Sequence, residues 1–157
     1  MTLKLVVFDL DFTLWDCGGT FCDETMPPFM LKNNKVTDSW GRHIKLYDEV
    51  LPILNFLKEN SILAAIASRT HQPDWALELL ELLKVKGRFD YLEIFPGTKS
   101  QHVKNIQERA GVSFKEMLFF DDEHRNIEDV SELGVRSVYV REGINMKILL
   151  EQMRKFS

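Results

Sequence analysis

Short apolar segments recur along the chain and alternate with longer segments in which apolar residues are spaced as on one face of a helix. Each short segment is almost free of polar residues, which is typical of strands buried on both faces of a parallel sheet. The longer segments carry leucine, valine and tryptophan at helical spacing. Strands are predicted at residues 3–8, 62–67, 91–95, 117–120 and 135–140, and helices at about 48–57, 73–83, 100–110, 126–133 and 145–156.

This alternation predicts an α/β fold, a doubly wound and mostly parallel five-stranded sheet with helices on both faces. With 157 residues, of which 45% are hydrophobic, the chain suits a single domain over 1–157. Residues 15–46 are rich in glycine, proline and asparagine, so we expect a small flap or hairpin there. Because 70–98 holds only one predicted helix and one strand, no capping domain fits, and we expect an open site that admits bulky substrates.

Aromatic residues in and around this flap are candidate rim contacts for such a site. For most of them, packing of the flap onto the body is the expected role. The four residues are Trp15, Phe21, Phe29 and Trp40.

The net charge and the cysteine content limit which binding partners and which cellular compartment are expected. The formal net charge is −4 and the pI is about 5.6, which argues against nucleic acid or an anionic membrane as a partner. No apolar segment approaches membrane-spanning length. The two cysteines, Cys17 and Cys22, suit a reducing compartment better than a disulfide framework, so a cytoplasmic location is expected. The oligomeric state is left open.

Polar residues follow four of the predicted strands at the point where each strand ends. In a doubly wound sheet the carboxyl ends of the strands meet at one edge, where ligands bind. We therefore expect these residues to share a crevice although they are far apart in the sequence. They are Asp9 and Asp11, then Ser68 and Arg69, then Lys99, and finally Asp121 and Asp122.

The negative charges of this set predict a bound cation. Four aspartates contribute a charge of −4, and each close pair repels by roughly 4 kcal/mol at an effective dielectric near 20. A divalent cation and Lys99 together contribute +3, and Arg69 brings the total to zero if it points inward. Since the ligands are all oxygen atoms, without histidine or cysteine, Mg²⁺ suits the site better than zinc.

Taken together, these motifs resemble those of the haloacid dehalogenase (HAD) superfamily: an Asp-x-Asp-x-Thr motif, a serine or threonine, a lysine and an acidic pair. More narrowly, they are similar to the magnesium-dependent phosphatase-1 family, and the resemblance covers essentially the whole chain. It implies a magnesium-dependent phosphomonoester hydrolase acting on a phosphorylated small molecule, such as a sugar phosphate, or on a phosphoprotein such as a phosphotyrosine substrate. The matching segments are 8–15, 67–70, 96–99 and 119–126.

The resemblance also implies roles for the residues. Asp9 would be the nucleophile that becomes an aspartyl phosphate, and Asp11 the general acid and base. Mg²⁺ would be held by Asp9, the backbone carbonyl of Asp11 and Asp122. The expected phosphate contacts are the backbone N–H of Leu10, the Ser68 hydroxyl and Lys99, with Arg69 as a candidate. Asp121 and Asn126 would orient these groups.

Other interpretations of the same residues stay open at this point. Ser68 is also a suitable helix cap and Lys99 a suitable solvated lysine. The chain as a whole is compatible with a non-catalytic phosphate-binding or receiver-like signalling module, although a receiver needs a phosphoacceptor aspartate where Ser68 and Arg69 stand. An acyl-carrier-type relative that transfers a phosphate-derived group shares the first motif, but Phe12 replaces its asparagine.

Overall fold

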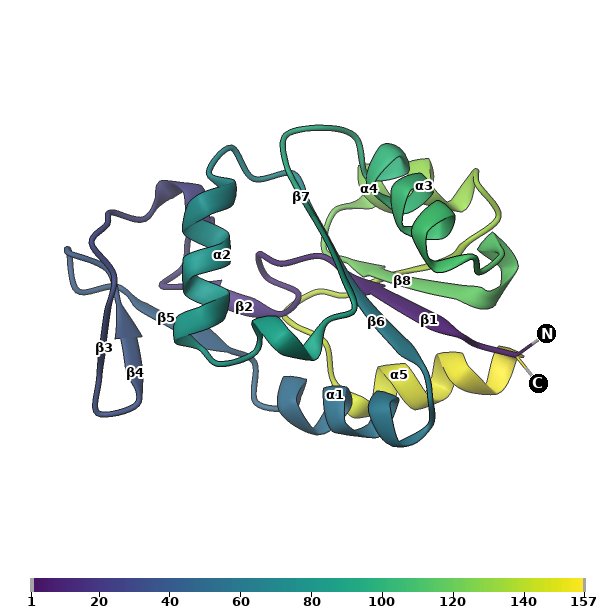
Figure 1. Cartoon of the computed structure of the whole chain (residues 1–157), viewed down its shortest axis with the longest axis horizontal. Helices are drawn as coiled ribbons and strands as arrows, with labels where there is room; N and C mark the ends of the chain where they lie inside the picture. Colours follow the sequence, from purple (N-terminus) through teal and green to yellow (C-terminus); the bar gives the residue numbers. More distant parts are fainter. Residues whose placement is uncertain (1, 157) are drawn as a thin grey trace.

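A computed structural model of the chain describes residues 2–156. Its main element is a five-stranded parallel sheet in the order β7-β6-β1-β8-β9, which confirms the predicted fold class (Figure 1). The first strand of the chain lies at the centre of the sheet, as its unbroken apolar sequence requires. The strands are β1 (Leu5–Phe8), β6 (Leu63–Ser68), β7 (Tyr91–Ile94), β8 (Met117–Asp121) and β9 (Arg136–Tyr139).

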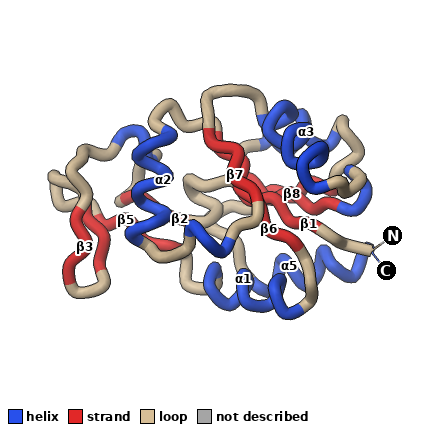
Figure 2. Tube along the Cα trace, viewed as in Figure 1, coloured by secondary structure: helices blue, strands red, loops and turns tan. Residues whose placement is uncertain are grey.

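Helices cover both faces of this sheet (Figures 1 and 2). Alternate residues of β1 point to opposite faces: Val6 and Phe8 join a core cluster with residues of α1, α2 and α5, whereas Leu5 and Val7 join one with residues of α3 and α4. The helices are α1 (Val50–Glu59), α2 (Pro73–Leu82), α3 (Lys99–Ala110), α4 (His124–Ser131) and α5 (Met146–Met153). Single 3₁₀ turns lie at η1 (Cys22–Glu24), η2 (Lys86–Arg88), η3 (Phe114–Glu116) and η4 (Arg154–Phe156).

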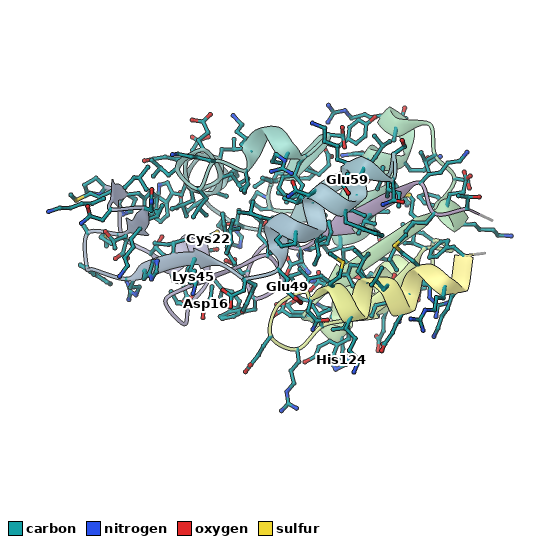
Figure 3. The ribbon with its side chains drawn as sticks, turned by 90° about the horizontal axis from the view of Figure 1, so that it is seen from below. Asp16, Cys22, Lys45, Glu49, Glu59 and His124 are labelled. Carbon is teal, nitrogen blue, oxygen red and sulfur yellow. The ribbon has the colours of Figure 1, made fainter. Side chains whose placement is uncertain are left out.

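The closing helix α5 packs beside α1, and Figure 3 shows the two side by side. Glu49, labelled in Figure 3, precedes α1, and its carboxylate accepts a hydrogen bond of 3.0 Å from the backbone N–H of Met146 in α5. No helix within residues 2–156 has the length and apolarity needed to cross a bilayer.

The strand register places the predicted site residues at the same edge of the sheet. Phe8, the last residue of β1, is paired with Ile66 of β6 and with Phe120 of β8. The three central strands therefore end within two residues of one another, and the chain that follows each of them emerges at the same edge. This alignment places Asp9 and Asp121 next to each other although 111 residues separate them.

The flap over residues 15–46 contains more structure than the hairpin expected from its sequence. It forms a four-stranded antiparallel sheet in the order β2-β5-β4-β3, which projects beyond the carboxyl edge of the main sheet (Figure 1). Strands of three or four residues are too short for alternating polarity to be recognised in the sequence. They are β2 (Trp15–Cys17), β3 (Met30–Lys32), β4 (Lys35–Thr37) and β5 (His43–Leu46).

Candidate active site

A cleft with a volume of about 280 Å³ lies at the carboxyl ends of β1, β6 and β8. It gathers residues from all four motifs, which come from strand ends and from the start of α3. Two predicted residues do not line it. Asp121 is fully buried, and the Leu10 side chain is fully buried in the core, so only the Leu10 backbone is available for the predicted contact. The predicted residues that line the cleft are Asp9, Asp11, Ser68, Arg69, Lys99 and Asp122.

Lys99 and Asp9 form a buried ion pair in the wall of the cleft. The Lys99 Nζ lies 2.7 Å from Asp9 Oδ1 and 3.1 Å from Asp121 Oδ2, and it also donates a hydrogen bond to the backbone carbonyl of Ala67. Its side chain is 1% exposed, so it is not the solvated lysine that the isolated sequence allows. The other oxygen of Asp9 accepts a hydrogen bond of 3.2 Å from the Thr13 hydroxyl.

Burial and charge act in opposite directions on this pair. Burial lowers the pKa of Lys99, but the carboxylates of Asp9 and Asp121 outweigh it and raise that pKa above its ordinary value. Burial raises the pKa of Asp9, while Lys99 lowers it and Asp121 raises it further. Lys99 therefore stays charged and faces two carboxyl groups.

Asp11 is placed by a tight loop that follows β1. The backbone N–H groups of Thr13 and Leu14 both donate to the Leu10 carbonyl, and Phe12 adopts a left-handed conformation with φ of 63°. Burial, followed by the negative charge of Asp9, raises the pKa of Asp11 to about 7. A carboxyl group with such a pKa can both donate and accept a proton near neutral pH.

The two aspartates at the end of β8 have different surroundings. Asp121 is fully buried, and both of its oxygens are engaged: Oδ1 accepts from the backbone N–H of Glu123 at 2.9 Å, and Oδ2 accepts from the Asn126 amide at 3.1 Å and faces Lys99. Asp122 is half-buried and lines the cleft. Burial and a hydrogen bond to Asp9 raise the pKa of Asp122 to about 9.

The carboxylates at the ends of β1 and β8 fit a hard divalent cation. Asp9, Asp121 and Asp122 each offer a carboxylate oxygen, and these three oxygens lie within 4.8 Å of one another. Asp9 and Asp122 line the cleft, whereas Asp121 is fully buried and does not, so Asp9 and Asp122 are the carboxylates that a metal in the cleft can reach. Carboxylate oxygens are the ligands that Mg²⁺ prefers, so the residues present fit that ion.

Ser68 and Arg69 face the same cleft from the end of β6. Ser68 does not cap α2, because it is the last residue of its strand and the helix begins only at Pro73. Its oxygen accepts a hydrogen bond of 3.3 Å from the backbone N–H of Thr70, which leaves its hydroxyl hydrogen to be donated. Arg69 is held by a hydrogen bond of 3.2 Å from its Nη1 to Asn126 Oδ1, so it lies toward the acidic pair.

A family model of acid phosphatases matches residues 1–157 of the chain. The chain is also 40% identical over 156 residues to the human magnesium-dependent phosphatase 1, a match that covers 98% of this chain and 87% of the relative. The chain belongs to the acid phosphatase family. A HAD-like hydrolase superfamily protein of Schizosaccharomyces pombe is 37% identical over 142 residues, which cover 84% of this chain and 82% of that protein. The predicted family is thereby confirmed.

Solved structures of the same superfamily share the fold of this acid phosphatase family member at low sequence identity. A HAD family enzyme from Bacteroides thetaiotaomicron, solved as a magnesium complex, superposes with a TM-score of 0.69 at 18% identity and covers 96% of this chain and 99% of that one. A HAD-superfamily hydrolase from Ehrlichia chaffeensis gives a TM-score of 0.71 at 15% identity, with 99% and 98% covered.

The structure separates the four candidate rim aromatics of this acid phosphatase family site. Trp15 is fully buried, so it is not a rim contact and has the packing role expected for most of the four. Phe29 is buried against Trp75, with ring centroids 6.3 Å apart, and Trp40 is exposed but does not line the cleft. Of the four candidate aromatics, Phe21 alone lines it.

Sequence reasoning missed several residues of the cleft. Most of them lie on loops, Asp23 lies in η1 and Arg125 in the first turn of α4, and only the folded chain brings them to the edge of the sheet. Thr13 is different, because the family motif includes a threonine at this position and could have pointed to it. The missed cleft residues are Asp23, Thr70, His71, Pro96, Gly97, Glu123 and Arg125, whereas Asn126, which was expected to orient the site, also lines the cleft.

Proposed function

We propose that this protein is a magnesium-dependent phosphomonoester hydrolase that acts through an aspartyl phosphate on Asp9. The observation that carries the proposal is the convergence of Asp9, Asp11, Lys99 and Asp122 at one cleft from the ends of β1 and β8 and the start of α3. Mg²⁺ held by Asp9, Asp122 and the backbone carbonyl of Asp11 would supply positive charge to the phosphoryl oxygens and the reacting carboxylate. The magnesium named for the human relative and for the structural neighbour supports this choice of ion.

In the first half of the reaction a carboxylate oxygen of Asp9 attacks phosphorus, and the bond from phosphorus to the ester oxygen breaks. Asp11 donates its proton to that leaving oxygen, so the alcohol departs neutral. Lys99 favours the ionised form of Asp9 against the effect of burial, because its ammonium lies 2.7 Å from Asp9 Oδ1. An ionised carboxylate is the form that can act as a nucleophile.

In the second half Asp11 removes a proton from a water molecule while the water oxygen attacks phosphorus. The bond between phosphorus and Asp9 breaks, which releases inorganic phosphate and restores the carboxylate. One carboxyl group thus serves as acid and then as base, as its pKa near 7 allows.

Three further groups are positioned to hold the phosphoryl oxygens. The hydroxyl hydrogen of Ser68, the backbone N–H of Leu10 and the guanidinium of Arg69 are donors at the cleft, and donors aimed at developing charge stabilise the transition state. The flap contributes Phe21 and Asp23 to the lining of the cleft, and its sheet consists of four strands of three or four residues, which supports an open site. We infer that substrates with bulky leaving groups, including phosphotyrosine in a protein and sugar phosphates, can enter.

The test is hydrolysis of p-nitrophenyl phosphate with Mg²⁺, with excess chelator, and in the Asp9→Asn variant. We expect activity only with the cation, and a loss of at least about 1000-fold in Asp9→Asn because the nucleophile is removed. Asp48→Asn is the matched control, since the Asp48 side chain is 87% exposed and lies outside the cleft. Rapid quenching with labelled substrate should trap protein-bound phosphate that hydroxylamine releases.

Each part of the proposal has an outcome that contradicts it. Full turnover in excess chelator would exclude a role for the cation. A quenched enzyme that carries no hydroxylamine-labile phosphate under rapid turnover, or an Asp9→Asn variant with the activity of Asp48→Asn, would exclude the covalent step on Asp9.

A further inference from the structure

The two carboxyl oxygens of Asp11 have different surroundings. Oδ1 accepts a hydrogen bond of 2.8 Å from the indole Nε1–H of Trp15 and one of 2.9 Å from the backbone N–H of Cys22, and the Cys17 thiol lies 3.8 Å from the same atom. No donor within residues 2–156 forms a hydrogen bond to Oδ2. Because Asp11 lines the cleft beside Asp9, Oδ2 is the oxygen left for the substrate.

The indole of Trp15 is itself fixed in place. Its side chain is fully buried, and its backbone N–H donates to the Leu10 carbonyl at 3.2 Å while its carbonyl accepts from Phe12 at 2.8 Å. Trp15 also begins β2, where it pairs with Leu46 of β5. The tight loop after β1 therefore returns the indole to the carboxyl group four residues earlier, and the flap sheet prevents it from moving away.

The second donor reaches Asp11 from a different part of the flap. Cys22, labelled in Figure 3, begins η1 and is buried, and its thiol contacts the Thr70 hydroxyl at 3.4 Å. Its backbone N–H thus approaches Oδ1 from a segment that is anchored to the end of β6. Two rigid donors on one oxygen fix the rotation of the carboxyl group about its last side-chain bond.

We propose that Trp15 is a positioning residue for Asp11: its indole N–H, together with the Cys22 amide, occupies Oδ1 and directs proton transfer to Oδ2. The inference rests on the proposed function of Asp11. In the first step the Oδ2–H bond breaks as the leaving oxygen takes the proton and its bond to phosphorus breaks. In the second step Oδ2 takes a proton from water, as the water oxygen bonds to phosphorus and the bond to Asp9 breaks.

The physical basis is the asymmetry of a carboxyl group. A protonated carboxyl has one hydroxyl oxygen that donates and one carbonyl oxygen that accepts, so two N–H donors on Oδ1 select Oδ1 as the carbonyl oxygen. Without the indole donor, the carboxyl group can rotate or place its proton on the wrong oxygen. Small misplacements of a reacting group reduce rates strongly, and here the loss falls on the step that needs the proton.

The test compares leaving groups in a Trp15→Phe variant, which keeps an aromatic ring but has no N–H. We expect kcat/KM for an alkyl phosphate, whose leaving group is poor, to fall about 10-fold, and kcat/KM for p-nitrophenyl phosphate to change less than about twofold. The ratio kcat/KM is compared because it reports only the step in which the leaving group departs, whereas kcat also contains the second step, which is the same for both substrates. Trp75→Phe is the matched control, because Trp75 packs on Phe29 and contacts neither Asp11 nor the cleft.

A second replacement covers the case in which Trp15→Phe does not fold. Benzothienylalanine at position 15, in a chain whose other two tryptophans are phenylalanine, has the shape of tryptophan with sulfur in place of N–H, and we expect the same dependence on the leaving group. In the unmodified protein, the Trp15 indole N–H resonance should shift when Asp11→Asn replaces the acceptor, whereas the Trp75 resonance should not.

The outcomes separate this inference from the proposed function. If Asp11→Asn is most impaired for poor leaving groups while both replacements of Trp15 reduce all substrates equally or not at all, Trp15 is merely structural and the inference fails. If Asp11→Asn itself has no dependence on the leaving group, the acid and base role of Asp11 is wrong, and the inference falls with it.

Discussion

The buried ammonium of Lys99 allows a stability prediction with a magnitude. Lys99→Met keeps the length of the side chain and removes its charge. The lost ammonium lies 2.7 Å from Asp9 and 3.1 Å from Asp121, and at an effective dielectric near 20 these distances correspond to roughly 6 and 5 kcal/mol of attraction. Desolvation of the charges offsets much of that, and removing one partner of a buried pair costs about 3–5 kcal/mol.

We expect Lys99→Met to lower the free energy of unfolding by about 4 kcal/mol, because two buried carboxyl groups lose the ammonium that is ion-paired with both. The measurement is urea unfolding near neutral pH in excess chelator, so that no metal replaces the lost charge. Lys104→Met is the matched control: it lies on the same helix, is exposed, and should change stability by less than about 0.5 kcal/mol.

A double variant tests whether the loss arises from the ion pair itself. Adding Asp121→Asn to Lys99→Met removes one of the two uncompensated charges, so it should recover roughly 1–2 kcal/mol of the loss. A loss in Lys99→Met below about 1 kcal/mol would refute the reasoning, since desolvation would then cancel the attraction. A double variant no more stable than Lys99→Met would assign the loss to packing.

Two further predictions concern residues outside the proton-transfer chemistry. Burial lowers the pKa of His102 to about 4, and its Nε2–H donates a hydrogen bond to the Phe95 carbonyl. Because this folded pKa lies below the unfolded pKa of about 6.5, the contribution of His102 to stability is complete above a pH of about 6.5. It falls by about 2 kcal/mol by a pH of about 5. His102→Gln should lack this acid-dependent loss in urea unfolding, and parallel curves for the two proteins would contradict it. Gly143→Ala should lower the free energy of unfolding by at least about 2 kcal/mol, because Gly143 has φ of 82° and an added Cβ meets the Tyr47 ring. Gly19→Ala is the control: Gly19 has φ of 85° but an added Cβ lies in open space, so the loss should be only about 1 kcal/mol. Equal losses in the two variants would exclude the clash with Tyr47.

The sequence by itself determined the layers of the fold and the edge at which the site lies. Runs such as Leu5 to Phe8 are apolar throughout and therefore belong inside a covered parallel sheet. Parallel strands expose their carboxyl ends at one edge, so Asp9, Ser68, Lys99 and Asp122 were predicted to converge without any knowledge of their contacts. The family motifs added chemical roles to this set, and the match to acid phosphatases confirms the family.

Only the tertiary structure decided which atom of each side chain meets which partner. The residue pattern alone could not separate Asp121 from Asp122, to which only the family resemblance gave different roles, because the physical difference lies in donors contributed by Lys99 and Asn126 from other elements. It left Trp15 as one of four candidate rim aromatics, whereas the left-handed turn at Phe12 brings the indole back into the core.

The flap shows the same limit for secondary structure. Its strands of three or four residues carry no periodic signal of their own and are held by pairing with one another, as β2 is with β5. A pattern of hydrophobic and polar positions records which face of an element is buried. Contacts between residues distant in the sequence decide where a side chain points, in which order short strands pair and which group neutralises a buried charge. These contacts exist only once the chain has folded.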